Sequence, residues 1–217
     1  MKTVPYYSRR EAGKVLAEAL ISYRGRPDVA LLSITPHSVT LGIEVAKFLV
    51  APLDLFLVRT LHTGTIPDAV IAGVASGGLS WTDTQRVEAG DPIVQKWIAT
   101  ERTNVETEEK RLRGDQPESD SWHLTFVLVD DGLSTGHTMQ TAVRLLRQRN
   151  PVGIIVATPI GTQEACQHLA AEVNELVCLT TVEQHGTEES YYVDPSALSE
   201  SELRAELKQY FRVQPVA

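Results

Sequence analysis

Residues 125–139, TFVLVDDGLSTGHTM, gather the side chains with the clearest chemical capability in this sequence. An apolar run ends in Asp130 and Asp131, and small hydroxyl-bearing residues and glycines follow before a helical pattern begins. The apolar run is typical of a strand that is covered on both faces, as parallel sheets require. Since ligands of open α/β sheets bind at the carboxyl ends of the strands, we expect the two carboxylates at a binding edge.

The turn after the two aspartates predicts a phosphate site. Ser134, Thr135, Gly136 and Thr138 bring hydroxyl and backbone N–H groups to a helix start, whose unpaired amides and dipole attract anions. The aspartates would repel a phosphate in contact, so they are expected to face sugar hydroxyls, a divalent cation or a developing positive charge. A ribose 5-phosphate activated at carbon 1 presents such groups. The alternative is an ordinary strand-to-helix connection in which one aspartate caps the helix.

The run VLVDDGLSTGHTM resembles the phosphoribosyl pyrophosphate (PRPP) motif of type I phosphoribosyltransferases, in which hydrophobic residues precede an acid pair and a Thr-Gly-x-Thr phosphate loop. Similarity to a bacterial group of predicted phosphoribosyltransferases extends over most of the chain. The resemblance implies a Mg²⁺-dependent enzyme that joins PRPP to a nitrogen nucleophile and expels pyrophosphate. It also implies the type I phosphoribosyltransferase fold.

The resemblance assigns a role to each residue of the motif. Asp130 and Asp131 would bind the ribose hydroxyls and Mg²⁺, and their charge would stabilise an oxocarbenium-like transition state. The 5-phosphate would be held by Ser134, Thr135, Gly136, His137 and Thr138. The imidazole of His137 either adds a donor and, when protonated, a charge, or the residue contributes its backbone N–H alone.

A second ligand loop departs from the family pattern. Where the related group has Pro-Arg-Gly-Gly, this chain has Thr35-Pro36-His37-Ser38, which lacks both glycines and, at Pro36, one N–H donor. The Arg-Lys pair after the next strand reads Arg59-Thr60, and Arg59 either binds a phosphoryl oxygen or is solvated. Two functions therefore stay open: phosphoribosyl transfer, and non-catalytic binding of PRPP or a nucleotide monophosphate by a regulatory protein.

The charge and composition of the chain limit the classes of partner that we expect. With 20 basic and 28 acidic residues among 217, the net charge is −8, which argues against nucleic acid and anionic membranes and leaves a small-molecule substrate. No run of about eighteen apolar residues occurs, and residues 1–8 hold no apolar run, so we expect a cytoplasmic protein. The resemblance implies a part in nucleotide metabolism. The length suits a single domain over residues 1–217.

Alternating strand and helix patterns predict a Rossmann-like α/β fold with a central parallel sheet and helices on both faces. Strands are expected at 29–34, 53–58, 69–75, 126–129, 152–157 and 176–179, and helices at 8–20, 38–49, 93–113, 138–149, 163–173 and 199–211. His62 is expected in a loop near a sheet edge, where it is either solvated or in contact with a substrate. Residues 79–121 are expected to form an inserted arm. This arm is either an active-site lid, the contact of a homodimer, or a surface arm without function. A further alternative is a structural role for the arm, with the ligand loop a relic.

Overall fold

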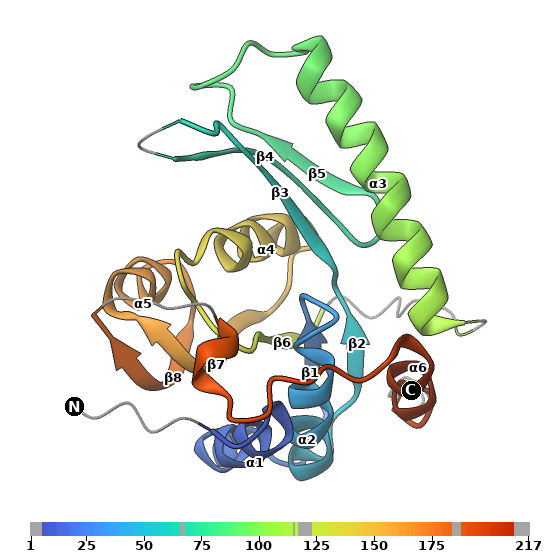
Figure 1. Cartoon of the computed structure of the whole chain (residues 1–217), viewed down its shortest axis with the longest axis vertical. Coiled ribbons are helices and arrows are strands. Elements are labelled where there is room, and N and C mark those ends of the chain that lie inside the picture. The colour runs from blue at the N-terminus through green and yellow to red at the C-terminus, as the bar shows by residue number, and fades with distance from the viewer. Residues whose placement is uncertain (1–5, 66–67, 115, 117–122, 184–187, 211–217) are drawn as a thin grey trace.

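The computed structural model describes residues 6–65, 68–114, 116, 123–183 and 188–210. In Figure 1 a central sheet with its helices forms the lower part of the molecule, and a smaller sheet with one long helix stands above it. We call the upper part, which holds β3 (Val58–His62), β4 (Val70–Ala75), β5 (Leu79–Thr82) and α3 (Pro92–Arg113), the hood. The candidate site lies on elements of the lower part, and the hood packs above it.

Five parallel strands form the central sheet, in the order β2–β1–β6–β7–β8. The strands are β1 (Val29–Ser33), β2 (Leu53–Leu55), β6 (Thr125–Val129), β7 (Gly153–Thr162) and β8 (Glu175–Val182). Every residue of β1, β6 and β7 is buried. Their apolar runs suit strands that are covered on both faces, and β6 lies in the middle of the sheet with its carboxyl end at the acid pair.

Helices cover both faces of this sheet (Figure 1). The lower part contains α1 (Arg9–Ala19), α2 (Val39–Leu49), α4 (His137–Arg147), α5 (Gln163–Ala170), α6 (Glu200–Leu207) and the short 3₁₀ helices η1 (Ile21–Tyr23) and η2 (Glu188–Tyr191). Alternate residues of a strand point to opposite faces. Accordingly Val127 and Val129 pack in the core under α1 and α2, whereas Phe126 and Leu128 pack in the core under α4 and α5. The predicted α/β fold is confirmed.

The hood is built on three antiparallel strands in the order β3–β4–β5. They are β3 (Val58–His62), β4 (Val70–Ala75) and β5 (Leu79–Thr82), and the long helix is α3 (Pro92–Arg113). Gly73 of β4 lets α4 approach closely, because a Cβ at this position would lie 2.3 Å from Cγ2 of Thr141. The hood therefore packs directly on the helix that follows the candidate phosphate loop.

Helix α3 has clear local reasons for its bounds. Asp91 caps its start by accepting hydrogen bonds from the N–H groups of Ile93 and Val94, and Gly114 ends it with a positive φ of 66°. Its buried apolar residues form a narrow stripe: Val94, Ile98, Val105 and Leu112. Within the described ranges, no helix is both long and apolar enough to cross a membrane.

Two expectations about the strands were wrong. The segment 53–58 was expected as one strand, but Phe56 and Leu57 lie between β2 and β3, where the chain leaves the central sheet for the hood. The segment 69–75 was expected in the parallel sheet, but β4 is antiparallel and belongs to the hood. An apolar run reports burial and not strand direction. Strand β5 was not expected, and it shares the hood with α3, β3 and β4.

Candidate active site

Asp130 and Asp131 follow β6 directly, and each residue is 6% exposed. Oδ1 of Asp130 accepts hydrogen bonds from the hydroxyl of Thr35 at 3.2 Å and from the backbone N–H of Asp131 at 3.0 Å. Thr35 follows β1, which pairs with β6 in parallel, so this bond joins the carboxyl ends of neighbouring strands. The acid pair and the turn after β1 therefore share one edge of the sheet.

Asp131 is held by Arg9 at its carboxylate and by Tyr192 at its backbone oxygen. Its Oδ2 accepts a 2.6 Å hydrogen bond from Nε of Arg9, and the two side chains are 9% and 6% exposed. Arg9 also donates to the carbonyl of Pro195 at 2.6 Å and lies over the ring of Tyr192. The Tyr192 hydroxyl donates to the backbone oxygen of Asp131 at 2.7 Å, and burial raises the pKa of this hydroxyl. No hydrogen bond among the described residues involves Oδ1 of Asp131, so this oxygen is available to a ligand.

The loop after the acid pair is anchored on β7 through its carbonyl groups. Leu133 donates its N–H to the Ile160 carbonyl at 2.9 Å and accepts the Thr162 N–H at 2.9 Å. The Thr162 hydroxyl donates to the Ser134 carbonyl at 2.8 Å. These bonds fix the loop and leave most of its N–H groups unused.

The unused N–H groups lie at the start of α4. Within the described residues, the backbone N–H groups of residues 134–136 and of Thr138 donate no hydrogen bond, and that of His137 approaches Oγ1 of Thr135 at 3.4 Å. Unpaired amides at a helix start attract anions. Residues 134–138 thus form a surface that suits a phosphate group.

Gly136 is required where the loop meets α4. Its φ is +74°, in the left-handed region that L side chains rarely adopt. A Cβ at this position would also lie 3.1 Å from the Cβ of Ala165 in α5. Both the backbone conformation and the close packing therefore exclude a larger residue without distortion.

The turn after β1 uses its N–H groups internally. The hydroxyl of buried Ser38 accepts from the Thr35 N–H at 3.3 Å and donates to the Thr35 carbonyl at 2.8 Å. The N–H of Ser38 donates to the Thr35 carbonyl and Oγ1, both at 3.2 Å. Pro36 has no N–H, so of the four turn residues only His37 has an N–H without a described partner. The turn therefore offers few backbone N–H donors to an anion.

Arg59 belongs to β3. The strand starts next to this turn, since the Val58 N–H donates to the Ile34 carbonyl at 3.1 Å. The Arg59 guanidinium forms an ion pair with Glu108 of α3 and donates to the Val58 carbonyl at 3.1 Å. The side chain is 34% exposed. Among the described residues, these two contacts leave other donors of the guanidinium unused, and Glu108 would compete with a phosphoryl oxygen for its charge.

Sequence reasoning missed one cluster beside the loop. His62 ends β3 and does not lie in a solvated loop; its Nδ1 is 2.7 Å from Oδ2 of Asp68, and its ring centroid is 5.3 Å from that of His137. Burial, followed by the proximity of His62, lowers the pKa of His137. His62 and Asp68 lie six positions apart on the β3–β4 hairpin, and the packing of the hood on α4 brings the distant His137 to them.

Comparisons with known proteins identify the family of this chain. The family model described as a phosphoribosyl transferase domain matches residues 9–192. A Mycobacterium tuberculosis protein with the provisional name of phosphoribosyl transferase, found in strains CDC 1551 and H37Rv, is 30% identical over 176 residues, which are 80% of this chain. The match covers 40% of that protein, so the chain spans less than half the length of these curated relatives.

A solved structure is similar along nearly the whole chain. The crystal structure of TT1426 from Thermus thermophilus has a TM-score of 0.81 and 28% sequence identity, and the similarity covers 95% of this chain and 99% of that one. The family match includes the acid pair, the loop at the start of α4 and Arg9. We conclude that the chain belongs to the phosphoribosyl transferase domain family.

Proposed function

We propose that the protein binds PRPP and transfers its phosphoribosyl group to a nitrogen acceptor, with release of pyrophosphate. The observation that carries this proposal is the pairing, at one sheet edge, of the acid pair with a loop whose N–H groups are unpaired. The loop of residues 134–138 would bind the 5-phosphate, and Asp130 and Asp131 would face the ribose hydroxyls. Membership of the family supports this chemistry.

In the proposed reaction the bond between ribose carbon 1 and the pyrophosphate oxygen breaks, and its electron pair leaves with pyrophosphate. The acceptor nitrogen forms the new bond to carbon 1 and loses a proton. Positive charge develops on the sugar ring as the first bond breaks, and fixed negative charges nearby stabilise it. Arg9 and Thr35 support this role, because they hold Asp131 and Asp130 in place.

Asp130 and Asp131 are also the residues that would hold Mg²⁺. Oxygen ligands suit this ion, and Oδ1 of Asp131 has no other partner among the described residues. When bound, Mg²⁺ would offset the negative charge of pyrophosphate. The residues present therefore fit the ion.

A second candidate function is binding of PRPP or a nucleotide monophosphate without turnover, as in a regulatory protein. The closed turn of residues 35–38 favours it, as does the ion pair between Arg59 and Glu108. A charge-assisted hydrogen bond contributes about 1.5–3 kcal/mol. Losing such bonds to pyrophosphate in the transition state would slow transfer by roughly one to several powers of ten.

The enzymatic proposal is tested by incubating the protein with PRPP, Mg²⁺ and a panel of nucleobases and amines, and measuring pyrophosphate. We expect release with at least one acceptor, and a loss of about 100-fold or more in Asp130→Asn and Asp131→Asn. Asp28→Asn is the matched control, because the Asp28 carboxylate pairs with Arg26 at the surface. Equal release from all four proteins would reject transfer by the acid pair.

Calorimetry separates the two candidates. PRPP that binds more tightly than ribose 5-phosphate in the presence of Mg²⁺, together with pyrophosphate release, would favour the enzyme, because the pyrophosphate then gains contacts of its own and is expelled. Equal affinities, together with no pyrophosphate release, would favour the binding protein. Thr135→Arg should abolish both affinities, since the larger cationic side chain would fill the proposed phosphate position.

The remaining expectations belong to this proposal and stay predictions. They are a homodimer, a cytoplasmic location, a part in nucleotide metabolism, and a contact between Arg59 and pyrophosphate. The role of residues 79–121 as a lid or a dimer contact also stays a prediction, and residues 115 and 117–121 of this arm lie outside the described residues. Sedimentation and a PRPP titration of Arg59→Ala would test the homodimer and the Arg59 contact.

A further inference from the structure

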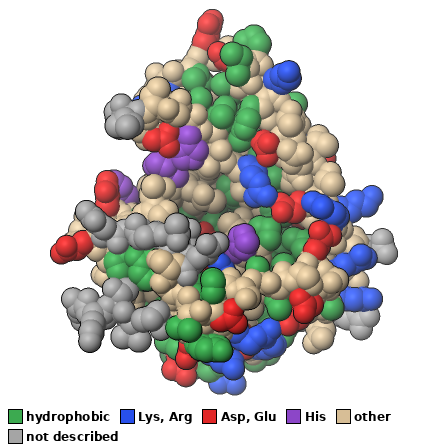
Figure 2. Space-filling model, in the orientation of Figure 1, with side chains coloured by type: hydrophobic (Ala, Val, Ile, Leu, Met, Phe, Trp, Pro, Cys, Tyr) green, Lys and Arg blue, Asp and Glu red, His purple; other side chains and the backbone are tan. Residues whose placement is uncertain are grey.

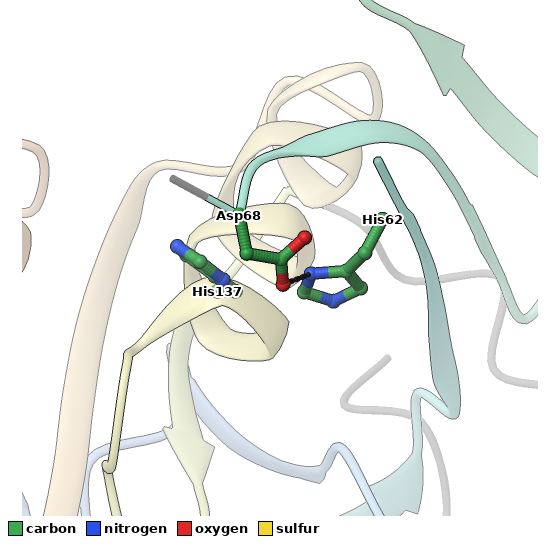
Figure 3. Close-up of side chains that lie close together, drawn as sticks. All are labelled: His62, Asp68 and His137. Carbon is green, nitrogen blue, oxygen red and sulfur yellow. Dashed lines mark hydrogen bonds and ion pairs between the residues drawn. The ribbon is translucent and has the colours of Figure 1, made fainter. Parts of the chain in front are cut away.

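Three side chains with metal-binding atoms converge between the hood and the start of α4. His62 comes from the end of β3, Asp68 from the connection to β4, and His137 is the first residue of α4. One ligand atom of each lies within 4.8 Å of the other two. Figure 3 shows the Asp68 carboxylate drawn between the two imidazole rings, and Figure 2 shows histidine side chains gathered beside an acidic one on this face.

The hydrogen bonds of this trio are incomplete. Nδ1 of His62 is 2.7 Å from Oδ2 of Asp68. Nδ1 of His137 is buried and has no hydrogen-bond partner among the described residues. A buried polar atom without a partner is unfavourable, and a metal ion that accepts its lone pair would remove this penalty.

Thr60 can hold His62 in the form that a metal requires. Its Oγ1 is 3.0 Å from Nε2 of His62. A hydroxyl can donate or accept a hydrogen bond, so Oγ1 can accept a hydrogen bond from Nε2–H when Nδ1 binds a metal. Such outer partners fix the tautomer and the orientation of histidine ligands. Thr60 is therefore a positioning residue for this site.

The ligand types point to one class of ion. Two imidazole nitrogens and one carboxylate oxygen make a three-residue set that suits Zn²⁺ and leaves a fourth position open. Mg²⁺ prefers oxygen ligands alone, so this site differs in chemistry from the acid pair. Zn²⁺ binds these atoms at about 2.0–2.2 Å, so small side-chain rotations would have to close the present separations. His62 and Asp68 are partly exposed and can rotate.

The geometry points to a binding site for a divalent transition-metal ion of the zinc class, formed by His62, Asp68 and His137. The site joins the β3–β4 hairpin of the hood to the first residue of α4. Asp68 and His137 also line a cavity of about 300 Å³ between α4 and the hood, together with Trp81 and Arg144. The fourth position of the ion would open toward this cavity, where water or a ligand atom completes the coordination.

The test is calorimetric titration of the chelator-treated full chain with Zn²⁺. We expect one Zn²⁺ per chain, and a loss of affinity of about 100-fold or more in His62→Ala and Asp68→Ala. Thr60→Val should lose roughly 10–100-fold, the usual effect of removing an outer partner. His168→Ala is the matched control, because His168 is exposed on α5, and it should bind as the unchanged protein does.

Circular dichroism of each variant shows that it is folded before titration. Co²⁺ then identifies the ligands, because thiolate ligands give an intense near-ultraviolet band and imidazole and carboxylate ligands do not. A thiolate band would assign the ion to Cys166 and Cys178 and overturn the proposal. It would equally be overturned by the absence of Zn²⁺ binding, by unchanged affinity in folded His62→Ala and Asp68→Ala, or by displacement of Zn²⁺ with equimolar Mg²⁺.

Discussion

Two segments at the same edge of the central sheet, the turn of residues 35–38 and the loop of residues 132–138, differ in what their backbone offers a ligand. They follow the paired strands β1 and β6, and each leads into a helix. In the turn, the hydroxyls of Thr35 and Ser38 accept hydrogen bonds from the turn's own N–H groups. In the loop, the Thr162 hydroxyl donates to the Ser134 carbonyl, and within the described residues the N–H groups of residues 134–136 and of Thr138 donate no hydrogen bond.

This difference shows that strand order and local hydrogen bonding determine two separate properties of the binding edge. Strand order decides where a ligand binds, because parallel strands bring their carboxyl ends to one edge. The partners of each connecting segment decide which part of the ligand is bound, because a side-chain oxygen within the segment competes for its N–H groups. We therefore expect one strong phosphate position at this edge, in the loop of residues 132–138.

The largest effect, a loss of folding stability, is expected at the acid pair, which lies between the two segments. Arg9→Ala leaves buried Asp131 without its cation, and removing one partner of a buried ion pair costs about 3–5 kcal/mol. Urea denaturation should show this loss in the free energy of unfolding. Arg26→Ala, at an exposed pair, should have no measurable effect. Equal losses in the two variants would mean that water already solvates Asp131.

Opening the turn should reduce the difference between the segments. The substitutions Thr35→Pro, Pro36→Arg, His37→Gly and Ser38→Gly remove both hydroxyls that close the turn and restore the sequence of the related group. One new charge-assisted bond of about 1.5–3 kcal/mol should raise the ratio of PRPP to ribose 5-phosphate affinity by roughly 10–100-fold. Calorimetry measures both affinities. An unchanged ratio in the folded variant would show that the turn does not limit pyrophosphate binding.

Straining the loop should affect stability and binding together. Gly136→Ala places a Cβ in the left-handed region, which costs about 1–2 kcal/mol, and presses it against Ala165. We expect weaker ribose 5-phosphate binding by calorimetry. Gly25→Ala is the matched control, because Gly25 has a φ of +69° and no atom within 4 Å of an added Cβ. If Gly25→Ala weakens ribose 5-phosphate binding equally, the loss in Gly136→Ala does not show that the loop binds the phosphate.

The smallest effect is expected at the support of the loop. Thr162→Val removes the bond to the Ser134 carbonyl and the N-cap of α5, which accepts the Ala165 N–H at 3.1 Å, at a cost of about 1 kcal/mol. Ribose 5-phosphate should bind a few-fold more weakly. Ser199→Ala removes the equivalent cap of α6 and should lower thermal stability without changing this binding. If both variants bind equally well, β7 does not hold the loop open.

The sequence was most informative where local chemistry and buried pattern agree. The apolar run before Asp130 predicted β6, and the small residues after it predicted the loop and the start of α4. Gly136 was recognisable as a position of close backbone approach, and its left-handed φ came from the coordinates. The loss of glycines at residues 35–38 signalled a changed turn, although the closure by Ser38 required coordinates.

Features that depend on long-range packing were not predictable. Strand β5 is only four half-buried residues, which is too short for a clear pattern. The direction of β4 depends on its partners in the hood, and those are not encoded in its own apolar run. The trio of His62, Asp68 and His137 forms because β3 and β4 pack on α4. The ion pair of Arg9 with Asp131 likewise joins residues 122 positions apart.

The central claim is that residues 130–138 bind a phosphorylated ribose, with the acid pair facing the sugar. A crystal structure of the protein with ribose 5-phosphate tests it most directly. The account predicts the phosphate within hydrogen-bonding distance of the N–H groups of residues 134–138 and the ribose hydroxyls on Asp130 and Asp131. A phosphate bound elsewhere, for example between Arg86 and Arg144 in the cavity under the hood, would contradict it.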